Sequence, residues 1–426
     1  SESQERMLII LEDGKENEAR KIFKKWDLDF VVIGRTTDNK NLSLKFKNEV
    51  VASIPIEALS SKAPLYDRKW VKKKIDKKKI NLKEHKKIKF DKAFFELISS
   101  PNYSNKKWVT EQYDQMVMGD TIERSGADAA IVKIHQKDKA IAVTVDSSAN
   151  YCKSHPISGG KQIVCESWRN LVSVGAKPIA ITNCLNFGNP ENPEIMGQFA
   201  ENILGIKEAC EFLDYPVVSG NVSFYNGTNN NNIYPTPVIG GVGIIKNLNK
   251  IHNHKFKKID SQIMIIGKTF GHLDQSAFIN ELFNIHDGMP PEINLLNEKN
   301  NGEMILKLID NESIASVHDI SSGGIILALA EMSISSQIGI KIQKPQKISN
   351  IFEYFFGEDQ GRYLIEVDKN NLPKVEKKLK DNNIYFENIG ITQKEYFELN
   401  KELKIKVKEL YELNNRWYNK FNGLNS

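Results

Sequence analysis

The segment 358–367 reads E-D-Q-G-R-Y-L-I-E-V, and the segment 2–11 reads E-S-Q-E-R-M-L-I-I-L. The two segments share the pattern E-x-Q-x-R followed by an apolar run, and they lie 356 positions apart. The correspondence continues without a gap to Ile33-Gly34, which matches Ile389-Gly390. Self-similarity at a fixed separation is the signature of a duplicated structural unit. The sequence therefore predicts that one fold element occurs twice in this chain.

Each copy of the repeat predicts a strand, a helix and a second strand. Short apolar runs favour strands, and the longer amphipathic segments between them favour helices. We expect residues 2–36 and 358–392 to superpose. The expected elements are strand 8–11, helix 15–26 and a strand ending at 33–34 in the first copy, and strand 364–367, helix 371–380 and a strand ending at 389–390 in the second.

The two copies differ in what precedes them. The second copy closes a unit that begins roughly 250 residues earlier, whereas the first copy begins at Ser1. This asymmetry predicts that the chain holds about one and a quarter copies of a duplicated architecture, with about 300 further residues expected before Ser1.

The composition is that of a globular protein with several domains. The 426 residues are 40% hydrophobic and 27% charged, and no run approaches the roughly 18 apolar residues of a membrane span. The first six residues are polar, unlike a secretory signal, and the four cysteines lack metal-binding spacing. We expect a cytoplasmic protein with reduced cysteines and no membrane contact.

The net charge of +5 comes from one segment. Residues 68–92 hold 13 basic and 3 acidic residues, so the rest of the chain sums to −5. The core of this segment, residues 72–80, has no aromatic residues for base stacking and matches no nucleic-acid-binding motif. We expect no nucleic-acid partner. A solvated linker is the simpler interpretation, and an electrostatic docking strip is the alternative.

Three segments place small, amide or acidic residues where a predicted strand ends. An apolar strand at 178–182 leads into a loop at 183–190, a buried strand at 216–218 ends in the polar residues 219–226, and residues 317–324 join His318-Asp319 to a helix opening at Gly323-Gly324. Ligands collect at the carboxyl ends of strands in α/β proteins. Asparagine oxygens suit Mg²⁺, and glycine lets backbone approach phosphate. A plain turn, a polar hairpin and a structural histidine remain the respective alternatives.

The chain contains no Walker A pattern and no nucleophile elbow. Any ATP site is therefore expected outside the P-loop class.

Seven short motifs are spread along nearly the whole chain. They are SESQERM at 1–7, YDR at 66–68, QYDQM at 112–116, GGK at 159–161, LNFGNP at 185–190, GNVS at 220–223 and HDIS at 318–321. Each is weak alone, but the ordered set with its repeat resembles the large-type phosphoribosylformylglycinamidine synthase family.

The resemblance implies an α/β and α+β fold of two repeated halves, each pairing an AIR-synthetase-like N-terminal domain with a second domain. It implies that the second half is complete and that only the end of the first is present. The expected divisions are the end of the first half's C-terminal domain at 1–64, a basic connecting segment at 65–119, a second N-terminal domain with the ATP cleft at 120–252, a second C-terminal domain at 257–398 and a tail at 399–426.

The resemblance also implies roles for individual residues. Glu2, Ser3 and Gln4 would contact formylglycinamide ribotide, and Ser223 would reach it from the other half. Asn183 and Gly220 would contact ATP, and Asn221 would ligate Mg²⁺. Relatives often carry aspartate where this chain has Asn183, so a neutral amide replaces an anionic acceptor. The catalytic histidines and remaining metal carboxylates are expected upstream of Ser1, so no residue here is assigned a catalytic role.

By the chemistry of that family, ATP would phosphorylate the formamide oxygen and ammonia would displace phosphate to give the amidine. Ammonia would come from a separate glutaminase subunit, bridged by a small third subunit. One alternative is a sister enzyme of the same superfamily, such as aminoimidazole ribotide synthetase, although the repeat argues against a single-unit enzyme. Another is a half without turnover of its own, which needs the missing N-terminal half.

Overall fold

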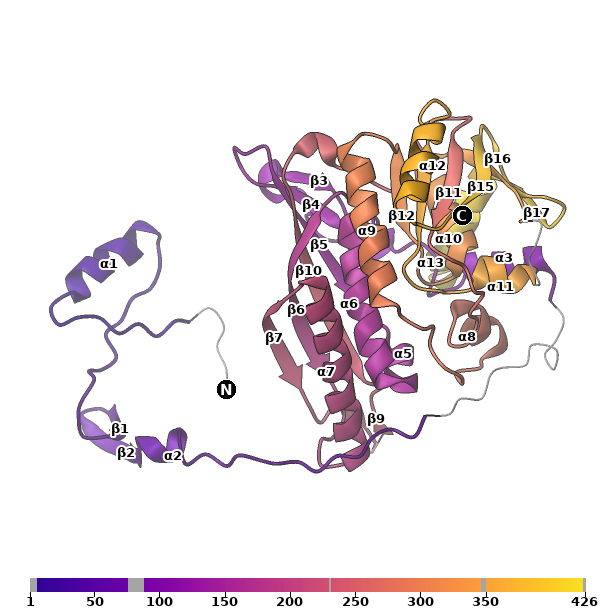
Figure 1. Cartoon of the computed structure of the whole chain (residues 1–426). Helices are drawn as coiled ribbons and strands as arrows, with labels where there is room; N and C mark the ends of the chain where they lie inside the picture. Colours follow the sequence, from indigo (N-terminus) through magenta and orange to yellow (C-terminus); the bar gives the residue numbers. More distant parts are fainter. Residues whose placement is uncertain (1–5, 76–87, 230, 346–349, 424–426) are drawn as a thin grey trace. The chain divides into compact units, whose positions relative to one another are not determined.

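The chain folds into two compact units, Ser1–Asp67 and Arg68–Ser426 (Figure 1). The computed structural model describes residues 6–75, 88–229, 231–345 and 350–423. The first unit is small, and the second holds two sheets with their covering helices.

The first unit confirms the helix of the repeat. Helix α1 spans Glu16–Lys25 and helix α12 of the second unit spans Leu372–Asp381, so both ends differ by the 356 positions that separate the repeats. A two-stranded hairpin and a short helix complete the described part of this unit. They are β1 (Asn41–Phe46), β2 (Glu49–Pro55) and α2 (Ile56–Leu59).

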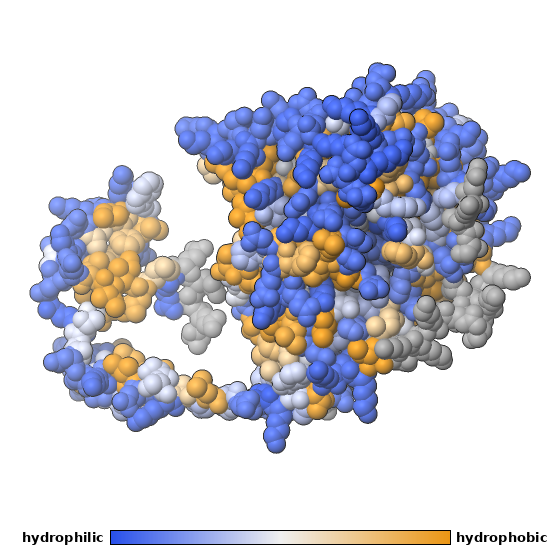
Figure 2. All heavy atoms as spheres, in the orientation of Figure 1, coloured by the Kyte–Doolittle hydropathy of each residue, from blue (hydrophilic) through white to orange (hydrophobic). Residues whose placement is uncertain are grey.

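The strands expected on either side of α1 do not form, so the predicted superposition holds only for the helix. In the second copy, β14 (Tyr363–Val367) lies between two other strands and β15 (Phe386–Gln393) does likewise. Within residues 6–40 of the first copy no strand is assigned, because a strand forms only when neighbours accept its backbone hydrogen bonds. Met7 and Ile33 are consequently 87% and 79% exposed, and Figure 2 shows hydrophobic residues on the surface of this unit.

The first sheet of the second unit has six strands in the order β3-β4-β5-β10-β6-β7. All neighbours are antiparallel except β6 and β7, which are parallel. The strands are β3 (Thr121–Glu123), β4 (Ala130–Lys133), β5 (Ala140–Asp146), β6 (Lys177–Asn186), β7 (Val217–Ser223) and β10 (Thr236–Ile245).

Two long helices cover one face of this sheet. Helix α6 (Pro156–Ser173) and helix α7 (Pro193–Leu213) each begin with proline, preceded by an N-cap whose side chain accepts a backbone hydrogen bond. The alternation of buried and exposed residues in β5 and β10 shows that only one face is covered. Short elements complete this part: α5 (Ala149–Ser154), β8 (Gly227–Thr228), β9 (Asn231–Asn232) and η3 (Leu248–Lys250).

The boundaries of β6 and β7 correct the sequence prediction. Residues 183–186 belong to β6 rather than to a loop, because Asn183 pairs with Ile239 of β10 and Asn186 pairs with Thr236. Strand β7 extends through Asn221 to Ser223, and it is an exposed edge strand rather than a buried one. Asn221 therefore lies within a strand and does not follow its end.

The second sheet has seven strands in the order β12-β14-β11-β15-β13-β16-β17. The strands new to this description are β11 (Gln262–Ile266), β12 (Ser316–Asp319), β13 (Gly339–Ile342), β16 (Tyr396–Leu399) and β17 (Leu403–Lys406). Its helices are α8 (Ala277–Phe283), α9 (Leu295–Asp310), α10 (Gly324–Ser336), α11 (Ile351–Phe356), α12 and α13 (Val407–Phe421).

The E-x-Q-x-R segment of the second copy is buried and fully engaged. Glu358 accepts hydrogen bonds from the backbone N–H groups of Ala277 and Gly323, both at 2.7 Å, and from the Tyr151 hydroxyl at 2.6 Å. Arg362 donates to the carbonyls of Gly357 and Asp359. The segment thus fastens the starts of α8 and α10 to α5.

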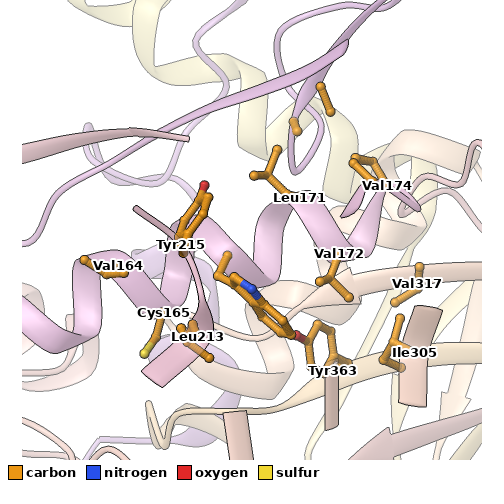
Figure 3. Close-up of a cluster of buried hydrophobic side chains, with 14 of the residues drawn as sticks. Val164, Cys165, Leu171, Val172, Val174, Leu213, Tyr215, Ile305, Val317 and Tyr363 are labelled. Atoms are coloured by element: carbon orange, nitrogen blue, oxygen red, sulfur yellow. The ribbon is translucent and has the colours of Figure 1, made fainter. Parts of the chain in front are cut away.

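One hydrophobic core spans both sheets. Residues from α6 and the first sheet pack with residues from α9, β12 and β14. Figure 3 shows Val172 of α6 in the same cluster as Ile305, Val317 and Tyr363. The two sheets of the second unit therefore fold around shared apolar contacts.

The segment 65–119, expected as a connection, contributes to a second core. Helix α3 (Phe90–Ile98) buries Phe94 and Leu97 completely, and the Phe94 ring stacks on Phe397 with centroids 5.5 Å apart. The remaining elements here are α4 (Lys107–Thr110) and η2 (Val117–Gly119). Only part of this segment is a simple linker.

Helices α6 and α7 approach so closely that one added methyl group between them should lower the stability of the fold. A Cβ on Gly160 would lie 2.3 Å from the backbone oxygen of Asn202, which cannot move without shifting α7. We expect Gly160→Ala to lower the free energy of unfolding by about 2 kcal/mol, measured by urea denaturation.

The control for this prediction is Gly34→Ala, where an added Cβ meets no atom within 4 Å. Equal stability of the two variants would show that α6 and α7 are not in the described contact.

Candidate functional site

The predicted nucleotide contacts Asn183 and Gly220 lie against each other. Strands β6 and β7 run in parallel, and their register pairs Asn183 with Gly220. A Cβ on Gly220 would lie 2.1 Å from the Asn183 side-chain oxygen. A side chain at position 220 would displace the Asn183 amide, so glycine preserves this contact. Two residues 37 positions apart in the sequence thus meet at one rung of the sheet.

The predicted site residues divide between the two faces of the sheet. Asn183 pairs with Ile239, a buried residue on the face that the helices cover. Asn221 pairs with Cys184, one position further along β6, so both lie on the open face. Ser223 pairs with Asn186 on that same open face. The nucleotide and metal predictions therefore concern opposite sides of one strand pair.

The open face of β6 and β7 carries a ladder of small polar side chains. Its rungs are Thr182 with Ser219, Cys184 with Asn221 and Asn186 with Ser223. The Ser219 hydroxyl donates to the Thr182 hydroxyl at 2.8 Å. Neither Thr182 nor Ser219 was predicted as a site residue from the sequence. A signal was available in β7, where the polar residues Ser219, Asn221 and Ser223 alternate with others, as residues on one face of a sheet must.

A pocket of about 430 Å³ lies on the covered face, between α7 and the strands β6 and β7. Its wall contains Asn183, Leu185, Ile206 and Cys210. The Tyr215 hydroxyl at one side lies 3.1 Å from the Ser167 hydroxyl. A mostly apolar cavity with one amide in its wall suits a flat, partly polar ring.

The other predicted substrate residues cannot be placed. Glu2, Ser3 and Gln4 lie outside the described residues. They remain predictions from the resemblance.

His318 is held between two carboxylates. Its Nδ1 lies 2.8 Å from Asp128 Oδ1, and its Nε2 lies 3.0 Å from Glu331 Oε2. An imidazole with an acceptor at each nitrogen is favoured as the cation, since a neutral ring carries only one N–H. Although burial opposes the charge, attraction to Asp128 and the hydrogen bonds to both carboxylates raise the pKa of His318. This arrangement supports the structural interpretation of His318.

Asp319 is engaged in a buried ion cluster. The Arg169 guanidinium donates to Asp319 at 2.5 Å, to Glu298 at 2.9 Å and to Gln360 at 3.1 Å. Arg169 lies on α6, whereas its partners lie on β12, α9 and the second E-x-Q-x-R segment. Nearby, burial raises the pKa of Asp146 to about 7, even though Thr144 and Asn170 donate hydrogen bonds to its carboxylate. This cluster joins the two sheets.

The described residues contain no group of three or more histidine, cysteine, aspartate or glutamate side chains placed to hold a metal ion. Among the helices of the described segments, none combines the length and apolar character needed to cross a lipid bilayer.

Comparison with known families identifies the class of protein. The N-terminal domain of AIR synthase related proteins matches residues 126–245. The C-terminal domain of the same proteins matches residues 262–399 and also residues 1–47, the two parts of the chain that carry the repeat. The chain belongs to the family of AIR synthase related proteins.

Within that family the chain is homologous to PurL over nearly its whole length. The phosphoribosylformylglycinamidine synthase subunit PurL of Pelagibacter ubique (strain HTCC1062) is 52% identical over 418 residues, which are 98% of this chain and 57% of the relative. The chain thus spans a little over half the length of the curated relatives it matches.

Solved structures of Thermotoga maritima PurL share the fold. PurL complexed with FGAR matches with a TM-score of 0.61 at 15% identity, covering 75% of this chain and 52% of that one. PurL complexed with ATP matches with a TM-score of 0.57 at 24% identity, covering 89% and 53%.

The His318 cluster predicts a pH-dependent stability. A raised pKa means that the folded state holds a proton more tightly than the unfolded state, whose histidine titrates near 6.5. The stabilisation is therefore complete below about pH 6.5 and is lost as the pH rises through the folded-state pKa. We expect the free energy of unfolding of the wild type to fall across that alkaline range, in urea titrations at a series of pH values, and His318→Gln to remove this slope.

His135, which is 66% exposed beside Asp120, provides the matched control. His135→Gln should keep the wild-type slope. A variant at position 318 with the same slope as the wild type would exclude an imidazolium at this position.

Proposed function

We propose that this chain is part of a phosphoribosylformylglycinamidine synthase. That enzyme converts formylglycinamide ribotide, ATP and glutamine-derived ammonia into formylglycinamidine ribotide, ADP and phosphate. The observation that carries the proposal is 52% identity to a PurL subunit over 98% of the chain. The paired strands β6 and β7, which bring together the residues expected to bind ligands, support it.

Asn183 is the proposed ATP contact of this chain, and it also lines the pocket on the covered face. Its wall combines the aliphatic side chains of Leu185, Ile206 and Val217 with the Asn183 amide. An amide both donates and accepts hydrogen bonds, as the edge of adenine does. The asparagine can therefore serve in place of the aspartate expected from relatives.

Asn221 is the proposed Mg²⁺ ligand of this chain. Its side chain is exposed on the open face, between the Thr182–Ser219 rung and Ser223. A neutral amide oxygen is a hard ligand, and Mg²⁺ commonly keeps waters and substrate phosphate oxygens in its remaining positions. The ion would neutralise charge on the transferring phosphoryl group. The other protein ligands would come from a second half.

Apolar side chains are exposed on the open face of the first sheet, as expected if a second half packs there. Val132, Ile141, Val143 and Val145 occupy adjoining strands on this face and are 40% to 72% exposed. An apolar patch of this kind marks a contact surface. The unpaired apolar segments of the first unit, around Met7 and Ile33, point the same way. We infer that a matching N-terminal half covers this face.

Two further partners follow from the proposed reaction. Ammonia reacts only if it reaches the phosphorylated intermediate, so a glutaminase subunit and a small bridging subunit would deliver it. The relative's own description as a subunit agrees with such an assembly.

The proposal predicts that this chain alone does not form the amidine from ATP, ammonia and formylglycinamide ribotide, because half of the cleft is supplied elsewhere. Adding the N-terminal half of a PurL protein should give turnover, measured as ADP release that depends on the ribotide. Turnover by the isolated chain would show that the catalytic groups lie within it. Failure of the assembled halves to turn over would reject the proposed function.

Asn221→Ala should lower kcat/KM of the assembled enzyme on the order of 10²-fold and raise its Mg²⁺ requirement, since one electrostatic ligand is lost. Folding should be unaffected, because Asn221 is exposed on an edge strand. Asn221→Asp keeps an oxygen at this place and should retain part of the activity. Asn249→Ala, on the exposed surface, is the control. Wild-type rates for Asn221→Ala at limiting Mg²⁺ would refute the metal role.

A further inference from the structure

Residues 68–73 run as an extended strap along helix α7, at the start of the second unit (Figure 1). The Val71 N–H donates to the Pro193 carbonyl at 3.1 Å, and the Lys73 N–H donates to Glu201 Oε2 at 3.0 Å. Between them, the Val71 carbonyl packs on Gly197, where an added Cβ would lie 1.9 Å from the carbonyl oxygen. These three sites on α7 are four residues apart and so share one helix face.

The strap explains part of the basic segment that the proposed function leaves unused. Lys73 is half-buried, and its ammonium group donates to the carbonyl of Lys153 at the end of α5. Burial, followed by repulsion from Lys153, lowers the pKa of Lys73. A lysine placed in this way is a docking residue rather than part of a solvated linker.

Arg68 fastens the other end of the strap to the loops that follow β6 and β7. Its guanidinium lies 3.3 Å from the Tyr225 hydroxyl and 3.6 Å from Glu191 Oε1. The Tyr225 hydroxyl itself donates to Glu191 at 3.2 Å. Tyr225 has a φ of 60°, which is uncommon for a residue with a side chain and needs support from its surroundings.

The two loops are in turn joined to the end of β7. The Phe187 N–H donates to the Ser223 carbonyl at 2.9 Å, and the Tyr225 N–H donates to the Gly188 carbonyl at 3.0 Å. The Asn226 side chain donates to the Ser223 carbonyl and hydroxyl oxygens, at 3.0 and 3.1 Å. A displacement of Tyr225 would therefore be transmitted to Ser223 within two residues.

We propose that residues 68–73 are a positioning strap for the Ser223 end of the site, with Arg68 as the positioning residue. The role in substrate binding rests on the proposed function, whereas the mechanical coupling does not. Arg68 does not need to touch substrate. It contacts both the Tyr225 hydroxyl and the Glu191 carboxylate. Through these two contacts the strap holds the loops that follow β6 and β7.

Two kinds of variant test the coupling in the chain itself. Gly197→Ala adds a methyl group that must displace the Val71 backbone, yet alanine favours the helix more than glycine does, so α7 should persist. Arg68→Gln removes the guanidinium. We expect both to speed amide hydrogen exchange of Phe187, Tyr225 and Asn226 about tenfold, while amides of the buried strand β11 keep their wild-type rates.

Matched controls separate this effect from general loss of stability. Lys404→Gln breaks a surface pair with Glu398 in the second sheet, and Gly34→Ala adds a methyl group in open space. Neither should alter exchange of the three loop amides. Arg68→Lys should restore protection only in part, because an ammonium group cannot match the fork of a guanidinium. Unchanged exchange within twofold in both test variants would overturn the coupling.

The functional readout uses the assembled enzyme. Arg68→Gln should raise the KM for formylglycinamide ribotide about tenfold and leave kcat within about twofold, because only substrate positioning changes. Faster exchange with an unchanged KM would reject the positioning role and leave a purely structural strap. If the assembled wild type has no activity, the proposed function fails, whereas the exchange experiment still decides the coupling.

Discussion

The ion pairs of the buried Arg169 guanidinium connect the two sheets of the second unit. The guanidinium extends from α6, which covers the first sheet, to Asp319 of β12 and Glu298 of α9, which belong to the second. Removing one partner from a buried ion cluster commonly costs about 3–5 kcal/mol, since the remaining charge stays desolvated. The two sheets also share one apolar core, so both polar and apolar contacts hold them together.

Several acidic and basic residues near this cluster are engaged in structural contacts. Asp319 and His318 are committed to Arg169, Asp128 and Glu331, and Glu358 is committed to the starts of two helices. The residues that remain available gather at β6 and β7, where an edge strand exposes small polar side chains on one face and borders an apolar pocket on the other. The contacts that join the two sheets are thus separate from the candidate ligand-binding residues, which lie at the edge of the first sheet.

Local pattern was sufficient for much of the fold, whereas the candidate site taken from it stays a prediction. The repeat predicted α1 and α12 with identical spacing, because the hydrogen bonds and the apolar face of a helix join residues three or four positions apart. It did not foretell that the strands around α1 would be unpaired, since strands need partners distant in sequence. For the same reason the sequence predicts a loop at 183–186 and places Asn221 beyond the end of its strand. In the folded chain, residues 183–186 pair with β10 and β7, and Asn221 of β7 pairs with Cys184 of β6.

Residue identity and order alone were enough to indicate the family. They also supplied the candidate residues Asn183, Gly220, Asn221 and Ser223, whose roles stay predictions. Their distribution over two faces, the contact between Asn183 and Gly220, and the engagement of His318 by two carboxylates came only from the folded chain. The strap of residues 68–73 belongs with these, because a basic segment has the same sequence whether it is solvated or docked on a helix. The pairing of Asn183 with Gly220 and the contact of Arg68 with Tyr225 join residues 37 and 157 positions apart, and such long-range pairings leave no mark in local sequence pattern.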